Sequence, residues 1–211
     1  MSPYGQRPLE FGVDVVMQSS TKSLSGHSDV LGGVLTTNNE DLAERLQFML
    51  KATGGVPSPF DNWILLRSTK TLALRYQKAS DNAEKLADWL NKQESIDRII
   101  YPGLKSHPQN EIATRQQRTP NGDIIYGNMI SIDLGNTQSR DSFLNHLEVF
   151  TLAESLGGVE SLVCVPFNMT HAAVPVETKL EMGITESLIR LSIGIEDFED
   201  IKSDLRKALN F

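Results

Sequence analysis

Apolar or long side chains recur at helical spacing between Trp63 and Leu90. Because one face of a helix repeats about every 3.6 residues, this spacing predicts one long or bent helix. The sequence differs before and after this helix: short apolar runs and turns precede the helix, and alternating runs typical of strands follow it. The sequence therefore predicts two domains, residues 1–66 and 96–211, joined by a connecting helix within residues 67–95.

The first domain is predicted to contain two strands and a helix. Residues 13–17 and 30–37 are short, mostly apolar runs, and the first has the continuous apolar character of a parallel sheet covered on both faces. Asn39 precedes a helix predicted over about residues 40–52, which has acidic side chains in its first turn and Lys51 in its last. We therefore expect an α/β layer.

The second domain has the pattern of an α+β layer. Strands are predicted at residues 99–101, 130–134 and 188–193, the second of which alternates with period two. Residues 104–128 are polar and are predicted to form surface helix and loop. A terminal helix is predicted over about residues 197–209.

Composition excludes several classes of function. The net charge of −7 and pI near 5.1 provide no basic field, so we expect neither nucleic acid nor a membrane as a partner. Cys164 is the single cysteine, which excludes an internal disulfide and favours a reducing, cytoplasmic location. No run approaches the roughly 20 apolar residues of a membrane span, and the N-terminus lacks signal-peptide features.

A turn rich in hydroxyl groups carries Lys22 directly after the first apolar run. Ser19 and Thr21 flank the lysine and could donate hydrogen bonds to a phosphate, and Gly26 permits close backbone approach. An amine that is desolvated on such a turn can become a nucleophile that forms a Schiff base. Most lysines are solvated surface charges, so these residues leave both interpretations open.

Two further segments could bind a ligand. Arg190 lies within an apolar strand, where its guanidinium needs either a ligand anion or an internal salt bridge with a structural carboxylate. Glu154 and Ser155 precede Gly157-Gly158, where bare backbone could approach a ligand, although such a pair is also an ordinary turn. The four histidines have no metal-ligand spacing, and no Ser/His/Asp set can be proposed, so neither a metal site nor a hydrolase is predicted.

Ordered motifs along the whole chain resemble the pyridoxal-phosphate enzymes of cysteine and methionine metabolism, the trans-sulfuration group that includes cystathionine gamma-lyase, gamma-synthase and beta-lyase. The resemblance implies an α/β fold of type I, like aspartate aminotransferase, with a partial large domain and a complete α+β C-terminal domain. The matching motifs include Tyr4-Gly5-Gln6-Arg7-Pro8, Ser19-Ser20-Thr21-Lys22, Gly26-His27-Ser28-Asp29, Pro57-Ser58-Pro59-Phe60-Asp61, Ala153-Glu154-Ser155-Leu156-Gly157-Gly158 and Leu188-Ile189-Arg190-Leu191-Ser192.

The resemblance assigns a role to each residue of the lysine turn. Lys22 matches the catalytic lysine that binds the cofactor, pyridoxal 5'-phosphate, and moves protons on the substrate. Ser19 and Thr21 match hydroxyls that bind the cofactor phosphate. The resemblance also implies a ligand for Arg190, because Arg190 and Ser155 match groups that hold the substrate α-carboxylate. Glu154 matches a position near the distal end of the substrate.

The resemblance favours a gamma-lyase-like reaction, which converts cystathionine to cysteine, 2-oxobutyrate and ammonia. Gamma-synthase or beta-lyase activity is the first alternative, and a non-catalytic truncated paralogue that acts as an interaction subunit is the second. In the family, an aspartate that pairs with the pyridinium nitrogen and a stacking tyrosine precede the segment that matches Met1, so we expect a fragment that lacks the N-terminal half. The full-length family is expected to form a homotetramer, a dimer of dimers, that acts on an amino-acid substrate.

Overall fold

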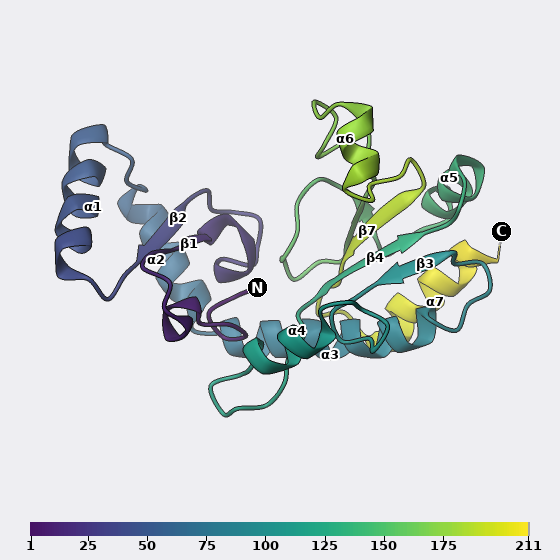
Figure 1. The fold of residues 1–211 in the computed structure, drawn as a ribbon, viewed down its shortest axis with the longest axis horizontal. Coiled ribbons are helices and arrows are strands. Elements are labelled where there is room, and N and C mark those ends of the chain that lie inside the picture. The colour runs from purple at the N-terminus through teal and green to yellow at the C-terminus, as the bar shows by residue number, and fades with distance from the viewer. Residues whose placement is uncertain (211) are drawn as a thin grey trace.

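A computed structural model describes residues 1–210 and has two lobes (Figure 1). The N-terminal lobe is built around a two-stranded sheet and the C-terminal lobe around a five-stranded sheet. The elements of the N-terminal lobe are η1 (Pro8–Phe11), β1 (Val16–Ser19), the π-helical turn η2 (Ser20–Leu24), β2 (Gly33–Thr36), α1 (Glu40–Thr53) and α2 (Pro59–Thr69). Helix α3 (Leu72–Leu90) follows them.

The two N-terminal strands form an antiparallel pair, in which Met17 lies opposite Leu35. The predicted parallel sheet with two covered faces is therefore wrong for this part of the chain, and the side chain of Met17 is 69% exposed. The reason is the connection: η2 reverses the chain between β1 and β2, whereas parallel neighbours need a long crossover, usually a helix. The predicted helix is confirmed as α1, with the Asn39 side chain accepting from Leu42 N.

The predicted long or bent helix is interrupted and forms two helices, α2 and α3. Thr71 lies between them with non-helical backbone angles (φ −109°, ψ 5°). Its hydroxyl donates to Ser68 O (3.1 Å), a local side-chain bond that competes with continued helical bonding. The later part of α3 contributes Leu86 and Leu90 to the C-terminal core, and the division at residues 66 and 95 stays a prediction.

The C-terminal sheet has the strand order β3-β4-β7-β6-β5. All neighbouring strands are antiparallel except β5 and β6, which are parallel. The three predicted strands are confirmed as β3, β4 and β7, with bounds that differ by at most one residue. The strands are β3 (Arg98–Ile100), β4 (Met129–Asp133), β5 (Thr151–Leu152), β6 (Leu162–Cys164) and β7 (Leu188–Ser192).

Helices α3 and α7 (Phe198–Leu209) cover the same side of this sheet (Figure 1). The terminal helix is confirmed, and Asp197 caps it by accepting from Glu199 N. Within residues 1–210, no helix has the length and apolar character needed to cross a membrane. The buried core between sheet and helices includes Leu86, Leu90, Ile130, Ile132, Ile189, Leu191, Ile201 and Leu205.

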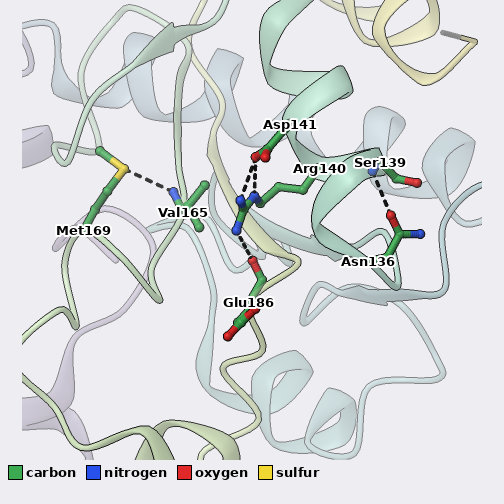
Figure 2. A network of polar contacts seen from close by, with 7 residues as sticks. All are labelled: Asn136, Ser139, Arg140, Asp141, Val165, Met169 and Glu186. Atoms are coloured by element: carbon green, nitrogen blue, oxygen red, sulfur yellow. Dashed lines mark hydrogen bonds and ion pairs between the residues drawn. The ribbon is translucent and has the colours of Figure 1, made fainter.

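Helices α4 (Asn110–Gln116), α5 (Thr137–Asn145) and α6 (Val176–Glu181) complete the lobe. Helix α5 is tied to the segment before β7 by Arg140, a buried side chain (Figure 2). Its guanidinium donates to the Asp141 carboxylate and to Glu186 O. This arginine lies in the C-terminal lobe and is ion-paired.

Candidate functional site

Lys22 lies on the π-helical turn η2, directly after β1. Its backbone angles (φ −92°, ψ −135°) depart from helical values inside the turn. The turn is closed by bonds from Ser25 N to Ser20 O (3.0 Å) and from Gly26 N to Lys22 O (2.8 Å). The side chain is half-buried, and the ion pairs formed within residues 1–210 do not include it. Its amine is therefore not neutralised by a carboxylate of the described chain.

The loop that contains Gly157 packs directly onto the lysine turn. Gly157 has a positive φ of 77°, and a Cβ atom there would lie 3.1 Å from Ser23 N and 3.5 Å from Lys22 Cβ. Its N–H donates to Ser192 Oγ on β7 (2.9 Å). Glycine thus serves here to admit the backbone of the lysine turn.

This packing brings predicted site residues together. Lys22 Nζ donates to Ser155 Oγ over 3.5 Å. Arg190 Nη2 donates to Glu154 O (2.8 Å) and to Ser155 O (3.4 Å), so β7 also holds this loop. The Glu154 side chain itself is exposed, and only its carbonyl joins this network.

Arg190 occupies the centre of the sheet, on β7 between Ser131 of β4 and Cys164 of β6. The ion pairs found within residues 1–210 do not include Arg190, so the internal salt bridge is not formed there. Because it has no carboxylate partner there, the guanidinium is available to bind an anion. Its positive charge also acts on Cys164: burial raises the pKa of the Cys164 thiol, and the nearby Arg190 charge opposes that rise.

The hydroxyls that flank the lysine differ in their bonding. Thr21 Oγ1 accepts from Gly32 N (3.0 Å), while its contact with Gly32 O is long, at 3.5 Å. The hydroxyl proton of Thr21 therefore remains suited to an incoming acceptor. Ser19 is exposed and pairs with Gly33 across the β1–β2 ladder.

A cavity of about 320 Å³ borders the lysine turn. Ser19 and Lys22 line it, whereas Thr21, Glu154, Ser155 and Arg190 do not. Further lining comes from Gln18, Ser23, Tyr76, Asn128, Leu156 and Gly157, among others.

These residues fit pyridoxal phosphate and an amino-acid substrate. An amine without an acidic partner suits an aldehyde, adjacent hydroxyls suit a phosphate, and a guanidinium without a carboxylate suits an α-carboxylate. Sequence reasoning missed Arg75, a buried arginine that contacts the lysine turn. The only feature of the sequence that marks Arg75 is its position within the helical pattern between Trp63 and Leu90.

The family model for Cys/Met metabolism PLP-dependent enzymes matches residues 1–210. A cystathionine gamma-lyase of Dictyostelium discoideum is 49% identical over 210 residues, which is 100% of this chain and 53% of that protein. The gamma-lyase of Bacillus subtilis is 47% identical over 208 residues (99% and 53%). A cystathionine beta-lyase of Lactococcus lactis is 46% identical over 208 residues, with the same coverage.

Solved structures of trans-sulfuration enzymes also match this chain. Cystathionine gamma-lyase from yeast has a TM-score of 0.94 at 45% identity, covering 100% of this chain and 53% of that one. Cystathionine gamma-synthase from Xanthomonas oryzae, solved with cystathionine, has a TM-score of 0.94 at 41% identity and the same coverage. The α/β fold therefore matches trans-sulfuration enzymes, and the chain spans about half the length of these relatives.

Proposed function

Because the chain belongs to the Cys/Met metabolism PLP-dependent enzyme family, we propose that it carries the lysine-bearing part of a gamma-lyase-like enzyme that cleaves cystathionine to cysteine, 2-oxobutyrate and ammonia. The observation that carries the proposal is the meeting of Lys22 with Ser155, whose carbonyl is bound by Arg190. Three segments far apart in the sequence thus contribute an amine, a hydroxyl and a guanidinium to one place.

Each side chain has a defined task in this proposal. Pyridoxal phosphate, when bound, supplies an electron sink for negative charge at the substrate Cα. Lys22 would take the proton from Cα, pass it to the cofactor and so become a free amine again, then take a second proton from Cβ and return it to the departing γ-thiolate. Its contact with the Ser155 hydroxyl supports this role, because a hydrogen bond orients the amine.

The remaining predicted residues bind the two anionic groups. Ser19 and Thr21, on the turn that carries the lysine, would donate to the cofactor phosphate. Arg190 and Ser155 would hold the substrate α-carboxylate, and a guanidinium can do so with two parallel hydrogen bonds. Glu154, which is exposed, would lie toward the distal end of the substrate.

Two alternatives have specific support. Relatives named beta-lyase and gamma-synthase match about as well as those named gamma-lyase, which favours a neighbouring activity. A non-catalytic interaction subunit is favoured by large exposed apolar side chains of the N-terminal lobe, among them Met17, Phe48 and Trp63. A homotetrameric assembly and a cytoplasmic location are further parts of the proposal, the latter supported by the free, buried Cys164.

The decisive experiment adds pyridoxal phosphate to the purified chain and records the visible absorption of the lysine-linked cofactor. We expect a band that Lys22→Ala abolishes. Lys51→Ala is the matched control, because Lys51 is exposed on α1 and should leave the band unchanged. A band that is absent, or present equally in Lys22→Ala, would sink the proposal for this chain.

The products then separate the activities. Release of 2-oxobutyrate from cystathionine supports gamma-lyase, and release of pyruvate supports beta-lyase. Formation of cystathionine from cysteine and an O-acylhomoserine supports gamma-synthase.

A further inference from the structure

We propose that Arg75 is a positioning residue that fixes the backbone of the lysine turn and so directs the Lys22 amine toward Ser155. The part of this inference that concerns the cofactor rests on the proposed function. Arg75 lies in the first turn of α3, and its side chain extends to η2. Within residues 1–210 its hydrogen bonds reach Thr71 and three backbone carbonyls and not the Lys22 amine, so it acts through the backbone.

The guanidinium of Arg75 joins three segments by hydrogen bonds. Nη1 donates to Ser23 O (3.0 Å), and Nη2 donates to Leu24 O (3.3 Å) and to Ser68 O (2.9 Å). Nε donates to Thr71 Oγ1 (3.1 Å). One side chain therefore ties the lysine turn to the end of α2 and the start of α3.

The environment of Arg75 is unusual for a buried cation. The residue is only 8% exposed, and burial lowers the pKa of its guanidinium. The ion pairs within residues 1–210 do not include it, so three carbonyl oxygens and the Thr71 hydroxyl, rather than a carboxylate, accept from its guanidinium. One of them, Ser68 O, belongs to the last turn of α2, where the helix dipole favours a cation. Removing the guanidinium would take this donor from Ser23 O and Leu24 O, which is costly in a buried place, whereas Ser68 O would keep its bond from Thr71.

The lysine turn is shaped around this guanidinium. Gly26 has a positive φ of 76°, and a Cβ atom there would overlap Arg75 Nη1. Ser23 directly follows Lys22, and the bonds to Ser23 O and Leu24 O restrain the Ser23–Leu24 and Leu24–Ser25 peptide groups. The backbone directly after the non-helical Lys22 is therefore held in place, which limits where the lysine side chain starts.

The test compares Arg75→Met with a control, Arg140→Met. Arg140 is also a buried arginine, but it lies in the C-terminal lobe. Hydrogen exchange is measured without cofactor at the amides of Ser25 and Gly26, which close the turn. We expect Arg75→Met to accelerate both by about tenfold or more, with β4 and β7 amides unchanged. Arg140→Met should leave the two turn amides within about twofold of the wild type.

Arg75→Lys is measured in parallel, because it keeps the charge but lacks the planar guanidinium fork that bonds Thr71 and the three carbonyls at once. It should accelerate the same amides by a smaller factor, and it decides the outcome if Arg75→Met unfolds. Wild-type exchange at Ser25 and Gly26 in the folded Arg75 variants, or equal acceleration by Arg140→Met, overturns the proposal.

A second readout uses the cofactor itself. Arg75→Met should raise by about tenfold the concentration of pyridoxal phosphate that produces half of the Lys22-dependent visible band. Arg140→Met should leave that concentration unchanged. If the wild-type chain forms no such band, the proposed function fails, but the exchange result still decides the role of Arg75.

Discussion

Ser155 Oγ lies 3.5 Å from Lys22 Nζ, although 133 residues separate the two. The contact depends on Gly157, which brings the loop against the backbone of the lysine turn. A second bond, from Val159 N to Gly26 O (2.9 Å), holds the same two segments together. The lysine and the residue predicted to bind substrate are therefore held in contact by backbone packing across the two lobes.

Gly157→Ala tests this packing. The substitution forces a positive φ on alanine, at about 1–2 kcal/mol, and places a methyl group against Ser23 N. We expect a loss of unfolding free energy of at least that size, measured by urea denaturation, and weaker binding of pyridoxal phosphate. Gly122→Ala is the control, since Gly122 has a φ of 91° but no atom near its missing Cβ. A Gly157→Ala chain that loses no more stability than the control would contradict the role of the close approach.

Arg190→Met tests the proposed carboxylate site. Loss of a charged hydrogen-bond partner costs about 1.5–3 kcal/mol, so an amino-acid ligand should bind roughly tenfold to a hundredfold more weakly to the cofactor-loaded protein. The measurement is a titration followed by the visible spectrum. Arg98→Met is the matched control, because Arg98 lies on the edge strand β3 and its side chain is 43% exposed. Equal affinities in the wild type and Arg190→Met would exclude this role.

Asp133 gives a pH-dependent contribution to stability. Burial pushes its pKa upward, but hydrogen bonds from Ser187, Thr185 and Gly135 N, together with the Arg98 charge, outweigh burial and lower the pKa. A folded pKa below the unfolded value means that the carboxylate stabilises the fold above the unfolded pKa. This stability is lost as the pH falls through the folded pKa.

Asp133→Asn should therefore lower the unfolding free energy at pH 7 by about 1–3 kcal/mol. The difference from the wild type should shrink below about pH 4, where the unfolded carboxyl is protonated. Denaturant titrations of both proteins between pH 7 and pH 3 measure this dependence. A difference that stays constant with pH would show that ionisation of Asp133 is not the cause.

The core against α3 should be sensitive to truncation. Leu86 is fully buried between α3 and the C-terminal sheet, so Leu86→Ala should cost about 2–5 kcal/mol of unfolding free energy. Leu74→Ala, on the same helix, is the control because Leu74 is 74% exposed and should change stability by less than about 0.5 kcal/mol. Similar losses in the two variants would mean that α3 does not pack as described.

Local patterns predicted the elements whose signals are contained in a few residues. Helix α1 was predicted from Asn39 and from the charges of its first and last turns, and α7 was predicted over about residues 197–209; the structure shows Asn39 and Asp197 as their caps. The strands β4 and β7 were long enough for a strand pattern. The short strands β5 and β6 were not predicted; they extend by pairing with each other and, for β6, with β7.

The sequence by itself determined the chemistry of the lysine turn, since Ser19, Thr21 and Lys22 are neighbours and their types alone predict an amine beside hydroxyls. Only the tertiary structure decided what meets that turn. The approach of Ser155 and the carbonyl bonds of Arg75 are contacts over 133 and about 50 residues, which depend on loop closure and burial rather than on local pattern. The direction of β1 and β2 was decided in the same way, by the reversal of the chain at η2.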